Sequence, residues 1–300
     1  MITTRSFMNQ NWIDLNSPTK EEIDSLVLTQ NIDPVVAKDF LAPTPTQYAR
    51  DKDKIIHIVL HIPAFKHSHS TSSIQEVDFI ISKNSVVTGR YDSIDALHHF
   101  AKQIEVNEIL NRDENFHLFF GIMKEIYKSM ADKLAYTGNW IEEIEKSIFE
   151  GKEKEMVFTI SNAGRNLLNF KRVVEAHGNI FEFVRDVGTE KFDKEFGDQA
   201  KTLIKEWRQV MKIVNDQIDL LAELRETNNS MLSTKQNEIV KNLAVIGSIL
   251  LPLTIIGQIF GLSVHSFPLI DNPNAFWIIL SLMAVVMSIS IIFAKLKKWM

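Results

Sequence analysis

Two stretches of twenty residues near the C-terminal end contain no Asp, Glu, Lys or Arg, and no other feature of the sequence restricts the fold as strongly. They cover residues 243–262 and 275–294. At 1.5 Å per residue, twenty helical residues extend over about 30 Å, which is the thickness of the hydrocarbon core of a bilayer. The sequence therefore predicts two membrane-spanning helices. A buried helical hairpin in a soluble protein is the alternative interpretation.

The segment between the two stretches predicts a short turn outside the cell. Residues 264–274 contain two prolines and two asparagines, which favour turns, and no Lys or Arg. Lysines flank the pair of stretches on the other side, at Lys235, Lys241, Lys295, Lys297 and Lys298. Because basic flanks stay on the cytoplasmic side, we expect a cell-membrane protein with both termini in the cytoplasm, including the basic tail 295–300.

The composition excludes several classes of protein. The sequence has 33 basic and 38 acidic residues, a formal net charge of −5, which argues against binding to nucleic acid phosphates. It has no Cys, so disulfides, thiolate metal sites and a cysteine nucleophile are excluded. It contains no glycine-rich phosphate-binding loop and no Gly-x-Ser-x-Gly motif, so we expect neither a bound nucleotide nor an enzyme.

Residues 1–105 predict a cytosolic domain with a mixed α/β layer. Four runs rich in β-branched residues are expected to form strands. These runs are 12–15, 55–62, 76–81 and 85–88. After the first run, Ser17 is predicted to cap a helix whose first position is Pro18.

Residues 106–197 predict a helical region. Apolar residues recur with helical spacing between charged ones, and the pattern is broken near Gly151, near His177 and between Gly188 and Gly197. Strand signals do not return after this point. The chain is therefore expected to continue as helices only.

Residues 198–241 predict a stalk helix that continues into the first span at 242–263. No Gly or Pro interrupts the helical pattern before Gly247. An unbroken helix of about sixty-five residues is about 100 Å long. Because a helix of that length is not stable alone, it implies a coiled-coil-like bundle with helices of other subunits.

Several segments resemble one known family in the same order along the chain. They are WIDLNSPTKEEI (12–23), IDPVVAKDFL (32–41), EVDFIISKNSVVTGRY (76–91), LLPLTIIGQIFGLS (250–263) and KLKKWM (295–300). Over nearly the whole chain, the sequence resembles CorA-type divalent-cation transporters. The resemblance implies an α+β fold with an α/β/α cytosolic domain, a stalk helix that continues as the pore-lining first span, a second span outside it, and a funnel-shaped homopentamer.

The sequence departs from this family at the outer mouth of the pore. The family typically ends its first span with Tyr-Gly-Met-Asn, whereas this chain has Phe260 followed by Gly261, Leu262 and Ser263. Since the Asn amides of the family hold a hydrated cation at the mouth, the resemblance implies that their loss alters the selectivity for magnesium. Asp271 is the only carboxylate of the loop, so the attraction of cations to the mouth is expected to be weaker.

A helical stripe on the first span coincides with the pore-lining positions that the resemblance implies. It consists of Val240, Leu243, Gly247, Leu251, Thr254 and Gln258. Thr254 and Gln258, with Ser263 beyond them, are predicted to offer hydroxyl and amide groups to the water shell of a divalent ion. In the alternative interpretation, Thr254 bonds a carbonyl of its own helix and Gln258 joins helices together.

The apolar members of the stripe are interpreted as a gate. Val240, Leu243 and Leu251 would form constrictions that exclude water, an assignment that rests on the resemblance. A doubly charged ion that moves down an inside-negative potential of about 100 mV gains about 4.6 kcal/mol. Passive flux therefore needs no nucleotide hydrolysis.

Four histidines form a separate candidate for metal binding. His57 and His61 are four positions apart on a predicted strand, hence on one face, and His67 and His69 follow in a Ser-rich turn. Such a set could bind Zn²⁺ or Ni²⁺. Because the sequence has no cysteine and no clear third ligand for either pair, a pair on a sheet face followed by a solvated loop is the alternative interpretation.

These features together predict a channel or transporter that conducts hydrated divalent cations, with Mg²⁺ first, down the membrane potential. Two alternatives stay open, namely a non-conducting pentameric sensor or scaffold anchored in the membrane, and transport of Co²⁺, Ni²⁺ or Zn²⁺. The expected partners are other copies of the chain, the lipid bilayer and divalent cations. No covalently bound cofactor is expected, and the resemblance implies regulation by cytosolic Mg²⁺.

Overall fold

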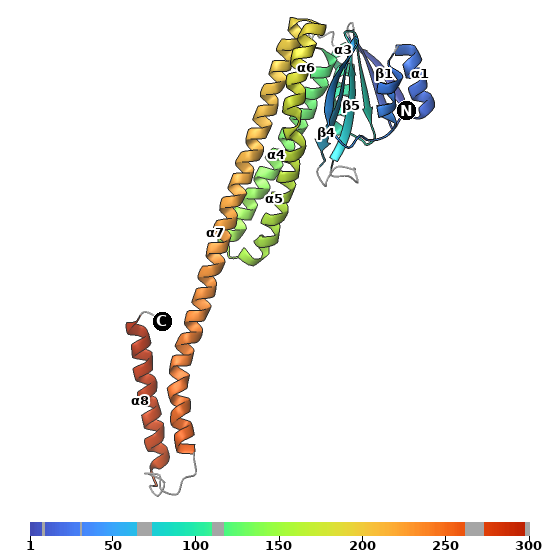
Figure 1. Ribbon diagram of the computed structural model, residues 1–300. Coiled ribbons are helices and arrows are strands. Elements are labelled where there is room, and N and C mark those ends of the chain that lie inside the picture. The colour runs from blue at the N-terminus through green and yellow to red at the C-terminus, as the bar shows by residue number, and fades with distance from the viewer. Residues whose placement is uncertain (8–9, 31, 65–73, 110–116, 262–272, 298–300) are drawn as a thin grey trace. The chain divides into compact units, whose positions relative to one another are not determined.

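The structure is a computed structural model that describes the chain except for residues 8–9, 31, 65–73, 110–116, 262–272 and 298–300 (Figure 1). It divides into two compact units, Met1–Arg225 and Glu226–Met300. The first unit contains a sheet and several helices. The second contains the end of one long helix and a separate apolar helix.

The first unit is built on a six-stranded sheet with the order β1-β2-β6-β5-β4-β3. β2 and β6 pair in parallel, and every other neighbouring pair is antiparallel. The strands are β1 (Ile2–Phe7), β2 (Gln10–Asn16), β3 (Tyr48–Lys52), β4 (Ile55–Pro63), β5 (Ile74–Ile81) and β6 (Ser85–Arg90). The four predicted runs lie in β2, β4, β5 and β6. The sequence did not predict β1 and β3, because both are edge strands with several polar, exposed residues.

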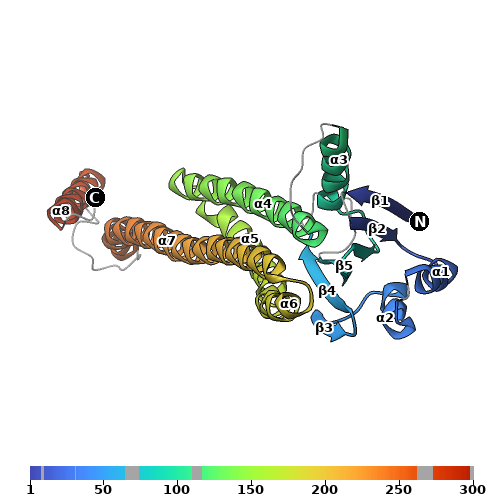
Figure 2. The same cartoon turned by 90° about the horizontal axis from the view of Figure 1, so that it is seen from above.

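Helices cover both faces of this sheet (Figure 2). On one face, α1 (Lys20–Gln30), α2 (Pro34–Lys38) and the 3₁₀ turn η1 (Asp39–Leu41) enclose an apolar core with β2, β5 and β6. On the other face, Trp12 contacts Phe100 of α3 (Asp95–Ile109), and Phe79 contacts Phe119 of α4 (Leu118–Phe149). The predicted α/β/α arrangement is confirmed.

The start of α1 differs from the prediction. Thr19, not Ser17, caps the helix, because the Glu22 backbone N–H donates to Thr19 Oγ1 at 3.3 Å and the Thr19 N–H donates to Glu22 Oε2 at 3.0 Å. This reciprocal pair is a capping box. Ser17 instead has a positive φ of 45° and donates its hydroxyl to the carbonyl of Tyr91. Pro18 therefore precedes the helix.

Three helices follow α3 and were predicted as a helical region. They are α4, α5 (Glu153–Glu175) and α6 (His177–Lys191). The breaks predicted near Gly151 and His177 are confirmed, and Gly151 has a φ of 92°, which favours glycine. Gly188 lies inside α6, so the third break is shorter than predicted. α5 packs against β4, and α6 packs against β3 and β4.

The stalk and the first span form a single helix, α7 (Lys194–Gly261). The helix begins at Lys194 rather than at residue 198, because the Asp193 carboxylate accepts the backbone N–H of Phe196 at 2.8 Å and caps it there. Gly197 lies within its first turns. Pro252 also lies inside the helix and does not end it.

α7 and α8 (Ala275–Leu296) are the two helices that are long and apolar enough to cross a membrane among the described residues. Only 6% and 0% of their most apolar windows are buried. The helices of a core hairpin would be mostly buried. The exposure therefore contradicts the alternative of a buried hairpin and agrees with two membrane spans.

Candidate functional site

The predicted stripe lies on one open face of the described part of α7. Val240, Leu243 and Leu251 are 64%, 63% and 64% exposed, and Thr254 and Gln258 are exposed as well. Their spacing of three or four residues keeps them on one side of the helix. Large apolar side chains left open in this way require cover by lipid or by other copies of the chain.

The opposite face of the same helix is packed within its unit. Val245 is 6% exposed, and Ile249 and Ile256 are half-buried. These positions lie about half a turn away from the stripe, at about 100° per residue. α8 runs beside the end of α7 (Figure 1), and its Ala294 is fully buried. We infer that α8 covers the back of the helix and leaves the stripe open.

Thr254 is already hydrogen-bonded within its own helix. Its hydroxyl donates to the carbonyl of Leu250 at 2.8 Å, as the alternative interpretation holds. This bond uses the one hydrogen of the hydroxyl, so its lone pairs remain to accept other bonds. Water molecules around a cation turn their hydrogens outward, towards acceptors. The own-helix bond therefore orients Thr254 as an acceptor and is compatible with a lining for hydrated cations.

Glycines of the span have open space around them within this chain. An added Cβ at Gly247 or at Gly261 would meet nothing within 4 Å in this chain. Packing inside the chain therefore does not require either glycine. Gly261 is the last residue of α7, whereas Leu262, Ser263 and Asp271 of the predicted mouth lie outside the described residues.

His57 and His61 are both engaged in the protein interior. His57 stacks on Phe40, lies edge-on to Tyr48 and has Nδ1 3.9 Å from Asp39 Oδ2. Burial lowers the pKa of His57 to about 4, so its ring is neutral. His61 Nε2 lies 2.9 Å from the Thr44 carbonyl oxygen.

A metal centre is not formed by the described residues. Among them, no group of three or more His, Asp or Glu side chains is placed to hold a metal ion. His67 and His69 lie outside the described residues, so the four-histidine site stays a prediction.

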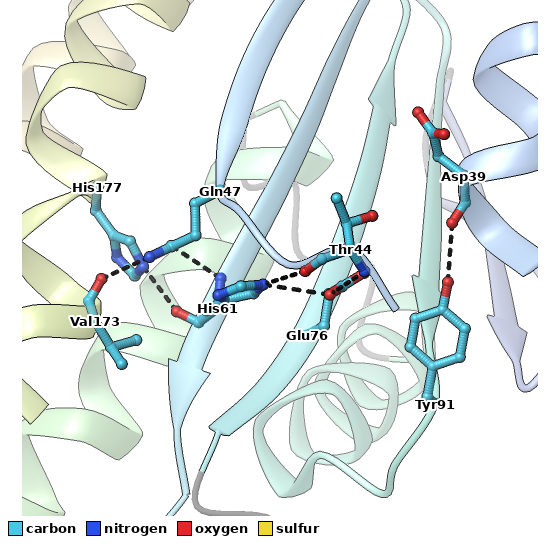
Figure 3. Close-up of polar contacts among 8 residues, drawn as sticks. All are labelled: Asp39, Thr44, Gln47, His61, Glu76, Tyr91, Val173 and His177. Carbon is cyan, nitrogen blue, oxygen red and sulfur yellow. Dashed lines mark hydrogen bonds and ion pairs between the residues drawn. The ribbon is translucent and has the colours of Figure 1, made fainter. Parts of the chain in front are cut away.

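The sequence analysis did not identify a buried polar network around β5 (Figure 3). Glu76 accepts the backbone N–H of Thr44 through both carboxylate oxygens, at 2.9 and 2.8 Å, and its Oε2 lies 3.3 Å from His61 Nε2. Asp78 is fully buried, and burial raises its pKa to about 9. The alternation of Glu76, Val77, Asp78 and Phe79 instead favours a half-exposed strand, so the local pattern did not indicate the burial of these carboxyls.

The sequence and the fold are similar to those of known proteins. A family model described as CorA-like Mg2+ transporter protein matches residues 9–298. The cobalt/magnesium transport protein CorA of Methanocaldococcus jannaschii is 23% identical over 292 residues, which cover 96% of this chain and 90% of that protein. The protein of the same name from Thermotoga maritima is 24% identical over 272 residues, with 90% and 77% covered.

A solved structure shows the same fold. The complete structure of the CorA magnesium transporter from Methanocaldococcus jannaschii matches with a TM-score of 0.84 at 22% identity, and the match covers 97% of this chain and 92% of that one. The match includes the α/β domain, the long helix and the two spans. The fold of nearly the whole chain is therefore established.

Proposed function

Because this chain belongs to the family of CorA-like Mg2+ transporter proteins, we propose that it is a membrane transporter whose α7 lines a path for hydrated divalent cations. α7 and α8 cross the cell membrane, and the first unit and both termini lie in the cytoplasm. The protein is a transporter and not an enzyme. Its relatives are named for cobalt and magnesium transport, which supports a divalent cargo.

The single observation that carries the proposal is the open stripe on α7. It presents Thr254 and Gln258 next to apolar residues, on the side of the helix opposite Val245. Polar side chains within a span need a water-filled path or another helix. Hydroxyl and amide groups hydrogen-bond the water shell of an ion without removing it, which suits Mg²⁺ because this ion loses water reluctantly.

The proposed assembly is a homopentamer in which each copy turns its stripe towards a common axis. One helix cannot enclose a pore, so the path exists only between copies. Val240, Leu243 and Leu251 would then narrow the path on the cytoplasmic side of Thr254. We further propose that cytosolic Mg²⁺, in addition to being cargo, regulates the assembly.

Ion influx into liposomes tests the proposal. The purified protein is reconstituted with a divalent-sensitive dye inside, and influx of Mg²⁺, Co²⁺, Ni²⁺ and Zn²⁺ is compared under an inside-negative potential. Gln258→Leu is expected to lower influx at least about tenfold, which corresponds to a barrier about 1.4 kcal/mol higher. Ser281→Leu is the matched control, because it makes the same kind of change at an exposed site of α8.

The outcomes separate the proposed path from the alternatives. Influx that Gln258→Leu leaves unchanged refutes the assignment of the stripe. If no ion enters through an intact assembly, at low and at high internal Mg²⁺, the protein is a non-conducting sensor or scaffold. Preference for one ion identifies the cargo.

A further inference from the structure

The charged side chains of the second unit gather at the inner ends of α7 and α8. In the described residues 227–261 and 273–297, the basic side chains are Lys235, Lys241, Lys295 and Lys297, and the one acidic side chain is Glu238. All five are exposed. This short region is therefore positive, although the whole chain has a formal net charge of −5.

Lys241 and Lys295 lie at the same level of the two spans. α7 ends at Gly261, α8 begins at Ala275, and the two helices run beside each other (Figure 1). Lys241 comes twenty residues before the end of α7, and Lys295 comes twenty residues after the start of α8. At about 1.5 Å per residue, each lysine is about 30 Å from the outer end of its span. Since this is the thickness of the hydrocarbon core, both lysines lie where the spans leave the lipid on the cytoplasmic side.

The lysines surround the contact between the two helices. Val245 of α7 and Ala294 of α8 are buried near these inner ends. Lys241 precedes Val245 by four residues, about one turn, so it lies on the buried side of α7 and not on the side of the stripe. Lys295 and Lys297 follow Ala294 directly along α8. Three positive side chains from two helices therefore lie at the cytoplasmic edge of one contact.

An apolar track leads from these lysines along α8 into the membrane. Ile289, Phe293 and Lys297 are spaced by four residues, so they share one side of the helix, and all three are exposed. A lysine lays its apolar stem along such a surface and holds its ammonium group at the polar interface. A phospholipid has the same order of parts, because its acyl chains lie in the hydrocarbon and its phosphate lies at the interface.

Two other charges define the limits of the lysine cluster. Glu238 precedes Lys241 by three residues on the same side of α7, so its carboxylate weakens the attraction for an anion. Lys235 precedes Lys241 by six residues, which places it about 9 Å farther from the span and on another side of the helix. Lys241 is therefore the lysine of α7 that can share one anion with those of α8.

We propose that Lys241, Lys295 and Lys297 bind the head group of an anionic phospholipid, whose acyl chain lies along Ile289 and Phe293. Phosphatidylglycerol offers the lysines a phosphate charge alone. Phosphatidylcholine adds a quaternary ammonium group, which the lysines repel. Each lysine close to an anionic membrane surface strengthens binding about fivefold. The bound lipid connects the inner ends of the two spans.

Lipid binding to the purified full-length protein in a neutral detergent tests the site. Phosphatidylglycerol and phosphatidylcholine with the same fluorescent acyl chain are titrated, and anisotropy gives a dissociation constant for each. We expect phosphatidylglycerol to bind at least about fivefold more tightly. Lys241→Gln and Lys295→Gln should each weaken its binding about fivefold and that of phosphatidylcholine less than about twofold. Lys295→Arg keeps the charge and should keep the tight binding.

Two matched variants separate a defined site from general attraction to positive charge. Lys235→Gln removes the same charge from the same helix and should change the binding of phosphatidylglycerol less than about twofold. Glu238→Gln removes the acid beside Lys241 and should strengthen binding. Equal losses for Lys235→Gln and Lys241→Gln overturn the site, as do equal affinities for the two lipids. If Lys241→Gln does not assemble, Lys295→Gln decides the matter in the same comparison.

A competition experiment distinguishes a lipid from a free anion. Inorganic phosphate is added to the protein with labelled phosphatidylglycerol bound. Phosphate lacks the acyl chain that contacts α8, so an equal concentration should displace little of the lipid. Displacement of half of the lipid at equal concentration assigns the lysines to a free anion and overturns the proposal. The measurements need no ion flux, so their result is independent of the transport proposal.

Discussion

Replacing Thr254 with Val removes one hydroxyl from the stripe while keeping the shape of the side chain. The helix keeps its own bonds, because the Leu250 carbonyl that accepts the hydroxyl also accepts the backbone N–H of residue 254. What is lost is an acceptor for the water shell of the ion. A hydrogen bond of this kind contributes about 0.5–1.5 kcal/mol net, whether made directly or through water.

The expected loss of flux follows from this energy. A barrier higher by about 1.4 kcal/mol slows passage about tenfold. Because every copy in the assembly loses its hydroxyl at the same level of the path, we expect Thr254→Val to lower Mg²⁺ influx into liposomes by at least about tenfold. Thr254→Ser keeps the hydroxyl and is expected to retain most of the influx.

A control in α8 separates the path from the stability of the helices. Ser288 donates its hydroxyl to the carbonyl of Ala284 at 2.8 Å, the same own-helix bond that Thr254 makes. Ser288→Ala removes that bond from the other span and should change influx by less than about twofold. Equal influx for Thr254→Val and the unaltered protein, with equal amounts of intact assembly, would refute the reasoning.

Two other predictions concern the apolar constriction and the sheet. Leu251→Asn is expected to raise resting influx of divalent ions into liposomes severalfold, because an amide holds water in a constriction from which leucine excludes it. A lower or unchanged dye signal contradicts the assignment of Leu251 to the gate. Asp14→Ala is expected to lower the free energy of unfolding of the first unit by about 3–5 kcal/mol, because Arg90, bonded to Asp14 at 3.1 Å, is only 17% exposed and loses its partner. Denaturation followed by circular dichroism measures this loss, and Arg90→Met in the same chain should restore most of it.

The membrane part of the fold could be predicted from the sequence because lipid imposes a simple condition. Every side chain in a span meets hydrocarbon, a neighbouring helix or a water-filled path, so the charge-free lengths of α7 and α8 stand out. The stripe was predictable for the same reason, since Thr254 and Gln258 recur at helical spacing among apolar residues. Which side of the helix stays exposed in a single chain was not predictable, because the burial of Val245 depends on tertiary packing and not on the local sequence.

The polar interior of the first unit could not be predicted in the same way. The pattern of β5 favoured a half-exposed strand, with Glu76 and Asp78 towards solvent. In the structure β5 is central, and the turn after α2 folds over that face, so both carboxyls are buried. The burial depends on Thr44, which is thirty-two positions from Glu76. Local pattern carries no information on contacts at that separation. The edge strands β1 and β3 were missed for another reason, because their polar, exposed residues leave no strand pattern.

The region where α7 leaves the first unit links the proposed assembly to the proposed gate. Every residue from 233 to 244 is exposed in the described chain, including the apolar side chains of Ile239, Val240 and Leu243. A helical segment of this length without a packed face is marginal in water. In the proposed assembly, other copies supply that packing, and Val240 and Leu243 are also the residues proposed to narrow the path. The apolar contacts that stabilise the helix are then the same contacts that exclude water from the path. Opening of the path therefore requires neighbouring copies to separate locally, and a change of one side-chain rotamer is not enough.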